Sequence, residues 1–81
     1  MKKVIRFTAS WCGPCKMLAK TLERIETDVS IEVIDIDENT DLANEFNIRS
    51  VPTLVMMEDN VVTKTLIGNK TIQELEAFIH D

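Results

Sequence analysis

The chain contains two cysteines, Cys12 and Cys15, and only Gly13 and Pro14 separate them. Two thiols at this spacing can close into a disulfide and open again, and the thiolate form of a cysteine is the one that attacks another disulfide. Pro14 suits the first position of a helix, because its missing N–H would have no partner there. Cys12 would then lie just before the helix, where unpaired N–H groups and the helix dipole stabilise a thiolate. The pattern therefore predicts redox chemistry by a pair of thiols.

The two cysteines are expected to play different roles. The helix start would lower the pKa of Cys12 below the value of about 8.5 for a free thiol, so Cys12 is the predicted nucleophile. Cys15 would fall in the first helical turn, on the inward side, where it is shielded and resolves the mixed disulfide that Cys12 forms. Gly13 lets the backbone of this short loop turn tightly. Since the dithiol itself carries two electrons, we expect no bound cofactor.

Two other uses of a Cys-x-x-Cys pair compete with redox chemistry. A structural zinc ion takes four ligands, and the single histidine, His80, lies far away in the sequence. We therefore predict no metal site within one chain, while two chains together would supply four thiolates to a zinc ion or an iron–sulfur cluster. A permanent disulfide here would close so small a loop that it would constrain the unfolded chain little.

The segments on either side of the cysteines predict a strand, a helix and a second strand. Residues 3–8 form a short β-branched run that is typical of a buried strand. Residues 14–27 carry apolar side chains every three or four positions, as on one face of a helix. Residues 31–36 predict the second strand. A helix that connects two strands of one sheet makes these strands parallel.

The last third of the chain predicts a hairpin and a helix. Two strands, residues 53–57 and 61–67, are separated by a turn at residues 58–60, and so short a connection makes them antiparallel. Thr71 and Glu74 have the spacing of a capping box, which begins a final helix.

A short helix is also expected around residues 42–46, begun by Asn39 or Thr40 and ended by Asn47 in the left-handed conformation. The predicted order is thus β-α-β-(α)-β-β-α, in one domain over residues 1–81. The fold class is α/β.

Three matches make the sequence similar to the thioredoxin family. Residues 11–16 read WCGPCK, which resembles the thioredoxin active-site motif residue for residue, and residues 49–53 read RSVPT, which resembles the segment with the family's cis-proline. Gly68 stands where the family has a glycine beside the active site. The resemblance covers nearly the whole chain. It implies a minimal thioredoxin fold, a four-stranded mixed sheet with helices on both faces, which lacks the N-terminal strand and helix of full-length thioredoxins.

The resemblance also implies a groove that receives an extended segment of the substrate. Trp11 would be a partly exposed wall of this groove, and the Val51–Pro52 bond would be cis and packed beside the cysteines. The backbone of Val51 would pair with the substrate as an added strand. The predicted substrate-binding residues are Trp11, Gly13, Pro14, Val51, Pro52 and Gly68.

The implied activity is that of a protein disulfide oxidoreductase, which reduces target disulfides by dithiol–disulfide exchange. A flavoprotein of the thioredoxin-reductase type would supply the electrons, and the targets would be proteins such as ribonucleotide reductase and peroxiredoxins. One alternative is a glutaredoxin-like protein that glutathione reduces. Glutaredoxins commonly have paired glycines near the end of the last strand, however, and here Asn69 follows Gly68. The alternative from another class is the metal-bridged module.

Two positions depart from the family pattern. Thioredoxins usually bury an aspartate in the first strand behind the second cysteine and pair it with a lysine, and here the matching positions are Arg6 and Val33. On one hypothesis the Arg6 guanidinium lies near the cysteines, stabilises a thiolate and makes the couple more oxidising. On the other, Arg6 reaches water. Asp35, Asp37 or water would then serve as the base for Cys15.

Composition restricts the partners. Fourteen acidic and nine basic residues give a net charge of −5, which argues against nucleic acid or an anionic membrane. No apolar run approaches the ~20 residues that cross a bilayer, and Arg6 interrupts the run after the N-terminal lysines, so no signal peptide is expected. We expect a cytoplasmic monomer.

Overall fold

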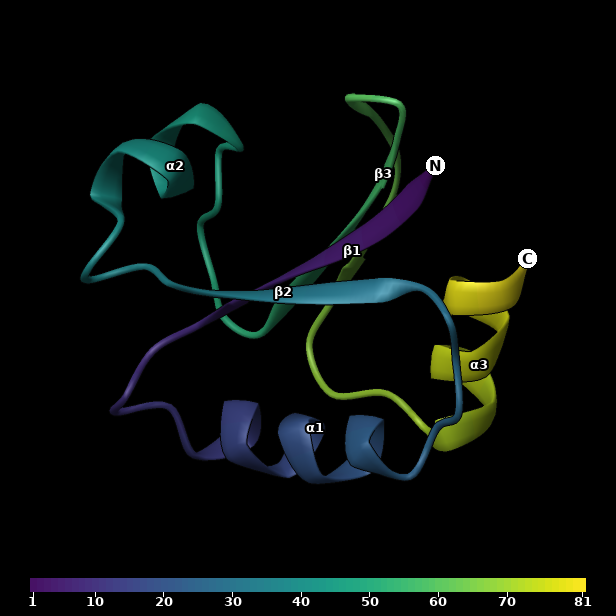
Figure 1. The fold of residues 1–81 in the computed structure, drawn as a ribbon. Helices are drawn as coiled ribbons and strands as arrows, with labels where there is room; N and C mark the ends of the chain where they lie inside the picture. Colours follow the sequence, from purple (N-terminus) through teal and green to yellow (C-terminus); the bar gives the residue numbers. More distant parts are fainter.

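The computed structural model describes all of residues 1–81 and shows one sheet with helices around it (Figure 1). In chain order the elements are β1 (Lys2–Thr8), α1 (Gly13–Glu23), β2 (Ser30–Asp35), α2 (Thr40–Glu45), β3 (Thr53–Glu58), β4 (Val61–Ile67) and α3 (Ile72–His80).

The sheet is mixed, and its strand order is β2-β1-β3-β4. Strand β1 is parallel to β2, as predicted from the helix that connects them, and antiparallel to β3. Strands β3 and β4 form the predicted antiparallel hairpin. The predicted fold class, a four-stranded mixed sheet with helices, is therefore confirmed.

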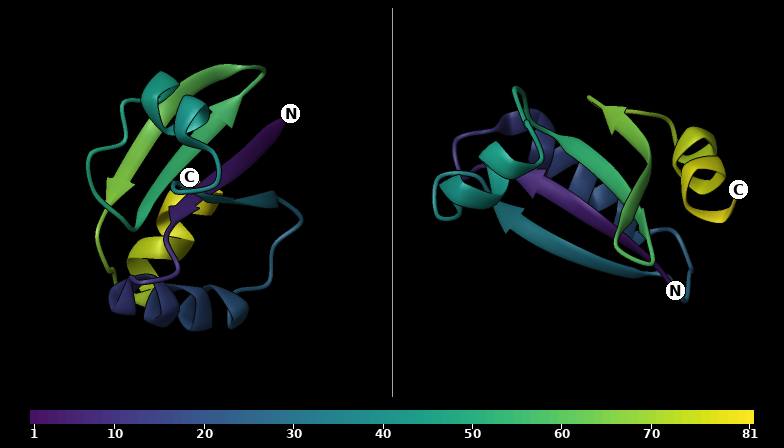
Figure 2. Two further views of the ribbon diagram at one scale, coloured as in Figure 1. Left: turned by 90° about the vertical axis from the view of Figure 1, so that its left-hand side faces the viewer. Right: turned by 90° about the horizontal axis from the view of Figure 1, so that it is seen from above.

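Both faces of the sheet are covered by helices (Figure 2). Successive strand residues point to opposite faces, and the alternation in β1 separates two hydrophobic clusters. The first cluster joins the sheet to α1 and α3 and consists of Val4, Leu18, Leu22, Leu54, Met56, Leu75, Phe78 and Ile79. The second lies on the α2 side and consists of Ile5, Phe7, Ile34 and Val55, with Leu42 and Phe46 packed against them. The core thus holds α1 at a fixed position over the sheet.

The predicted end of the first helix is wrong. It was placed near Thr27, but α1 ends at Glu23, and the N–H groups of Arg24 and Ile25 bond to carbonyl oxygens three residues back. This tighter turn ends the α-helix, and the Thr27 hydroxyl then accepts a hydrogen bond from the Val29 N–H at 3.0 Å. Ile25 and Val29 still pack against the core, but from the loop after α1. The apolar period therefore continues beyond the end of the helix that the structure shows.

Three non-glycine residues adopt positive φ. Asn47 has φ 56°, as predicted for the end of α2. Asp59 and Asn60 have φ 53° and 71°, so the hairpin turn has two residues of the type I′ kind rather than three, because Glu58 belongs to β3. None of the three helices combines the length and the hydropathy that a membrane span requires. The single domain predicted for residues 1–81 stays a prediction.

The capping box at the start of α3 gives a first test. The Glu74 N–H donates to the Thr71 hydroxyl at 3.2 Å, and the Glu74 carboxylate accepts from the Thr71 N–H at 3.3 Å. Thr71→Ala should lower the free energy of unfolding by about 1 kcal/mol, because the Glu74 N–H loses its acceptor and the Glu74 carboxylate loses the hydrogen bond from the Thr71 hydroxyl. Urea unfolding measures the change. Gln73→Ala, an exposed neighbour outside the box, is the matched control. Equal losses in the two variants would contradict the assignment.

Candidate active site

Cys12 and Cys15 form a disulfide at the N-terminus of α1, with their Cα atoms 5.3 Å apart. Helix α1 begins at Gly13, one residue before the predicted start, and Cys12 is its N-cap with an extended backbone (φ −90°, ψ 105°). Pro14 lies in the first turn, where its missing N–H leaves no gap in the helical hydrogen bonds. The sequence therefore starts the helix directly at the reactive pair.

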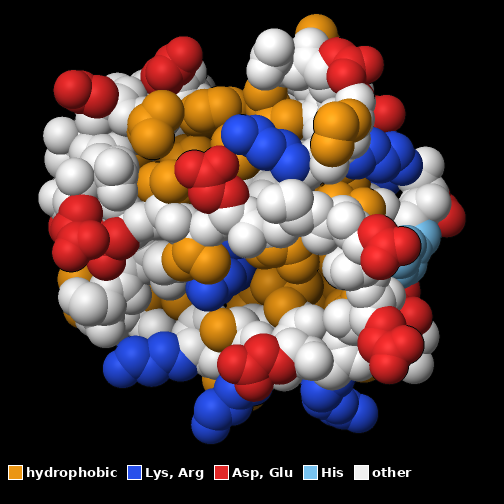
Figure 3. Space-filling model, viewed as in Figure 1, with side chains coloured by type: hydrophobic (Ala, Val, Ile, Leu, Met, Phe, Trp, Pro, Cys, Tyr) orange, Lys and Arg blue, Asp and Glu red, His pale blue; other side chains and the backbone are white.

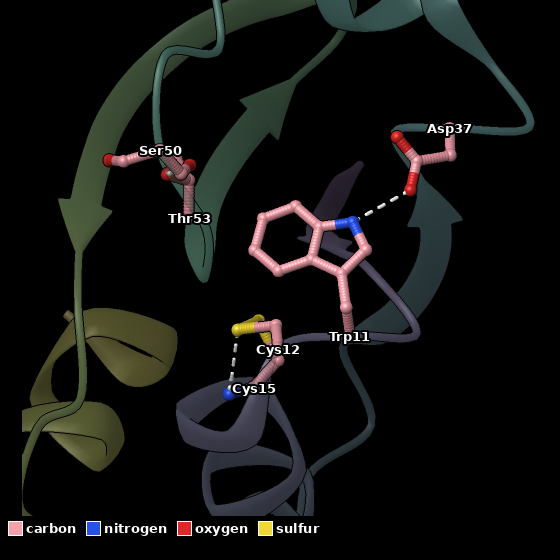
Figure 4. Close-up of a disulfide and its surroundings, with 6 residues drawn as sticks. All are labelled: Trp11, Cys12, Cys15, Asp37, Ser50 and Thr53. Atoms are coloured by element: carbon pink, nitrogen blue, oxygen red, sulfur yellow. Dashed lines mark hydrogen bonds between the residues drawn. A yellow bond between two sulfur atoms is a disulfide. The ribbon is translucent and has the colours of Figure 1, made fainter.

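The sulfur of Cys12 acts as the cap of this helix. The Cys15 N–H donates a hydrogen bond to the Cys12 Sγ at 3.1 Å (Figure 4), and the Cys12 N–H donates to the Ala9 carbonyl oxygen at 3.1 Å. Serine or aspartate oxygens usually accept this bond at helix starts. A sulfur in their place receives both an amide donor and the positive end of the helix dipole, and both favour a negative charge on it.

Both cysteines are buried in the disulfide state. Cys12 is 4% exposed and Cys15 is 1% exposed, and they form a small cluster with Ala9, against which Ile36 and Val51 pack. Cys15 lies on the inward side of α1. The difference in exposure between the two residues is small in this oxidised form, so the helix start, more than exposure, distinguishes Cys12.

The segments before β3 and after β4 meet beside the disulfide. The Val51–Pro52 peptide bond is cis, as the resemblance implied, and Val51 packs on the cysteine cluster. The Gly68 N–H donates to the Pro52 carbonyl oxygen at 2.9 Å, and Gly68 has φ 88°, a conformation that favours glycine. The Thr53 hydroxyl closes the turn on the Ser50 carbonyl oxygen at 2.8 Å.

Trp11 is 68% exposed, and its indole is held in place by Asp37. The Trp11 Nε1–H donates to the Asp37 Oδ2 at 2.8 Å (Figure 4). The sequence suggested Asp37 only as a base for Cys15, and its bond to Trp11 was not predicted. The parallel pairing of β1 and β2 could have predicted that Trp11 and Asp37 lie close together. It places Thr8 opposite Asp35 and so brings the segments after both strands to one edge.

The two departures from the family pattern are neighbours in the sheet, since Arg6 pairs in register with Val33. Val33 is 53% exposed on the edge strand β2. Arg6 is half-buried, and burial lowers the pKa of its guanidinium. Arginine remains protonated through the physiological pH range, so β1 carries a permanent positive charge here.

The disulfide is the redox-active group that the structure contains. Metal-ligating side chains do not gather in threes anywhere in the chain, and His80 lies at the end of α3. Cys12 at the N-cap of α1 and Cys15 in its first turn form this disulfide.

Comparison with known proteins agrees with this geometry. The family model described as thioredoxin matches residues 1–81. Thioredoxin of Listeria monocytogenes is 38% identical over 78 residues, which cover 91% of this chain and 76% of the relative. A solved mutant thioredoxin from Halobacterium salinarum superposes with a TM-score of 0.90 at 36% identity, over 96% of this chain and 71% of that one.

A second solved structure describes the thiol resolving mechanism in yeast mitochondrial 1-Cys peroxiredoxin via glutathione/thioredoxin systems. Its matching chain has a TM-score of 0.85 and 36% identity, and the match covers 96% of this chain and 76% of that one. With the family model, the relatives and the disulfide at the helix start in agreement, the chain belongs to the thioredoxin family and is a thiol–disulfide oxidoreductase.

Proposed function

We propose that this protein reduces disulfides in other proteins, with Cys12 as the nucleophile and Cys15 as the resolving thiol. The observation that carries the proposal is the hydrogen bond from the Cys15 N–H to the Cys12 sulfur at 3.1 Å. This donor and the helix dipole favour the thiolate of Cys12, and a thiolate is the attacking species. Cys15 has no such donor on its own sulfur in the structure.

The reaction proceeds in two exchanges. The Cys12 thiolate attacks one sulfur of the target disulfide, which breaks the target S–S bond and releases the other target sulfur as a thiolate. Cys15 then loses its proton to solvent and attacks Cys12, so that the mixed disulfide breaks and the target leaves fully reduced. The target gains two electrons, and the Cys12–Cys15 disulfide of the structure is the oxidised product.

A groove for the target would lie between Trp11 and the Val51–Pro52 turn. The N–H and carbonyl groups of Val51 make no hydrogen bond within the chain, so they are available to an extended peptide as in strand addition. Gly68 fixes this turn through its bond to Pro52. The proposed substrate-binding set is Trp11, Gly13, Pro14, Val51, Pro52 and Gly68.

The proposed electron donor is a flavoprotein of the thioredoxin-reductase type, and peroxiredoxins and ribonucleotide reductase are proposed targets. The structural relative described with a peroxiredoxin and glutathione/thioredoxin systems supports targets of that class. We propose the cytoplasm as the compartment, because its reduced thiol pool keeps such a dithiol in use. Glutathione is the second candidate for the donor, since that structural relative is described with glutathione as well as thioredoxin systems.

Reduction of insulin separates the two donors and tests the function. With NADPH and a thioredoxin reductase the protein should reduce insulin disulfides at many times the rate without it, and with glutathione and glutathione reductase the gain should be small. The readout is NADPH oxidation together with insulin precipitation. Greater activity with glutathione would move the protein to the glutaredoxin-like alternative. If neither donor supports turnover and purified protein contains stoichiometric metal, the metal-bridged module would replace the proposal.

The roles of the two cysteines predict opposite trapping behaviour. Cys15→Ser should accumulate a mixed disulfide between Cys12 and the target, because attack proceeds while resolution cannot. Cys12→Ser should trap no target and reduce no insulin. Non-reducing electrophoresis with mass spectrometry identifies the linked residue. Trapping through Cys15 in the Cys12→Ser variant, at the rate seen through Cys12, would reverse the assignment.

The bond between Trp11 and Asp37 predicts a change in substrate affinity. Asp37→Ala removes the acceptor of the indole N–H, so Trp11 becomes mobile and the groove loses a fixed wall. We expect KM for a protein disulfide to rise roughly twofold to tenfold, the range that one hydrogen bond supplies, with a smaller effect on kcat. Glu38→Ala, which removes a charge from the same turn, is the control. An equal rise in KM with Glu38→Ala would assign the effect to charge alone.

A further inference from the structure

A hollow of about 250 Å³ opens behind Cys15, on the face of the sheet that α1 covers. Neither Trp11 nor the Val51–Pro52 turn lines it, so it lies apart from the proposed groove. Figure 3 shows this face hollowed between β2 and α1, with a basic side chain set among hydrophobic ones. The residues that line it are Arg6, Thr8, Ala9, Ser10, Cys15, Lys16, Ala19 and Asp35.

Arg6 brings a charge into this hollow from the middle of the sheet. In β1 its neighbours in register are the exposed Val33 and the buried Leu54, so its stem crosses an apolar surface. Its guanidinium makes no hydrogen bond or ion pair in the structure. The two ion pairs of the chain join the N-terminal amine to Asp59 and Lys3 to Glu32. Arg6 is thus a half-buried cation whose charge no carboxylate neutralises.

The other charged groups that face the hollow are Asp35 on β2 and Lys16 on α1. The Asp35 carboxylate is committed to the turn after β2, where its Oδ1 accepts from the N–H groups of Asp37 at 2.8 Å and Glu38 at 3.3 Å. Lys16 is exposed on the first turn of α1, where water screens its charge. Arg6 is therefore the charge in this hollow that both lacks a partner and is partly buried.

We propose that Arg6 is a positioning residue for the resolving step, in which its guanidinium stabilises the thiolate of Cys15. The proposal rests on the role of Cys15 given above. Cys15 loses its proton to water in the open hollow, and its sulfur then attacks Cys12. The Cys12–target bond breaks, and the electron pair leaves with the target sulfur. Arg6 takes no part in bond making and acts only through its charge.

Burial and the charge of Arg6 act in opposite directions on the thiolate of Cys15. Cys15 is 1% exposed, and burial disfavours a negative charge on its sulfur. Arg6 lines the same hollow, and an opposite charge close to a thiolate lowers the pKa of such a group by roughly 1 to 3. Where the family pattern has a buried aspartate, this chain has a cation, which stabilises the charge that remains on Cys15 after its proton has left.

The first experiment measures the pKa of Cys15 alone in the Cys12→Ser protein, by the ultraviolet absorbance of its thiolate. Adding Arg6→Gln should raise the pKa of Cys15 by about 1, so the thiolate fraction near neutral pH falls about tenfold. Arg6→Lys should keep most of the effect because it keeps the charge. Arg24→Gln removes an exposed cation at the other end of α1 and should change nothing. If Arg6→Gln and Arg24→Gln give the same pKa, the proposal is overturned.

The second experiment follows the resolving step in the protein with both cysteines. Cys12 is loaded as a mixed disulfide with thionitrobenzoate, and release of the coloured thiol by Cys15 is recorded against pH in stopped flow. Arg6→Gln should shift the rising limb of this profile to higher pH by about the same amount, while Arg6→Lys leaves it near the wild-type position. An unchanged profile for Arg6→Gln would overturn the role of Arg6 and leave the roles of the cysteines intact. Failure of Cys12 to form the mixed disulfide would overturn the proposed function and, with it, the role of Arg6.

Discussion

The hydrogen bond from the Cys15 N–H to the Cys12 sulfur ties the chemistry of this chain to its fold. It exists because α1 begins at Gly13, which leaves the first amides of the helix without helical partners and places a sulfur in the capping position. A shift in the start of α1 would remove both the donor and the dipole that favour a thiolate on Cys12. The packing of Leu18 and Leu22 on the sheet fixes that start. The hydrophobic core of this small protein therefore sets the reactivity of its thiols.

Strand directions explain why distant segments meet at the disulfide. Strands β1 and β2 are parallel, so both end at the same edge, and Trp11 reaches Asp37 there. Strand β3 runs antiparallel to β1, with Thr53 opposite Phe7, so the Val51–Pro52 turn that precedes β3 lies at this edge as well. The last residue of β4, Ile67, pairs with Thr53 and delivers Gly68 to Pro52. One sheet topology thus assembles a site from four separate parts of the sequence.

The sequence predicted most of this arrangement where a local pattern had a single physical meaning. A short β-branched run located the first strand, the spacing of Thr71 and Glu74 located the capping box, and Pro14 located the start of α1 to within one residue. The end of α1 was wrong because Ile25 and Val29 continue the helical period although they pack from a loop. The bond between Trp11 and Asp37 was missed because it depends on the register of two strands, which no local pattern contains. The cis bond before Pro52 followed from resemblance and not from the residues themselves.

Arg6 lies between the core and the surface, where it keeps part of its hydration and is not fully screened by water. A cation fully inside the core would lose its hydration, and one at the surface would be screened before it could influence a buried sulfur. Because β2 is an edge strand and Val33, the neighbour of Arg6 on it, is 53% exposed, the guanidinium keeps part of its hydration. The inner wall of the hollow that Arg6 lines is Cys15, where the surroundings are apolar and a charge acts over a longer range than in water. Where the family pattern has an aspartate and a lysine, this chain therefore has a positive charge, Arg6, in the hollow that Cys15 lines, and an apolar neighbour, Val33.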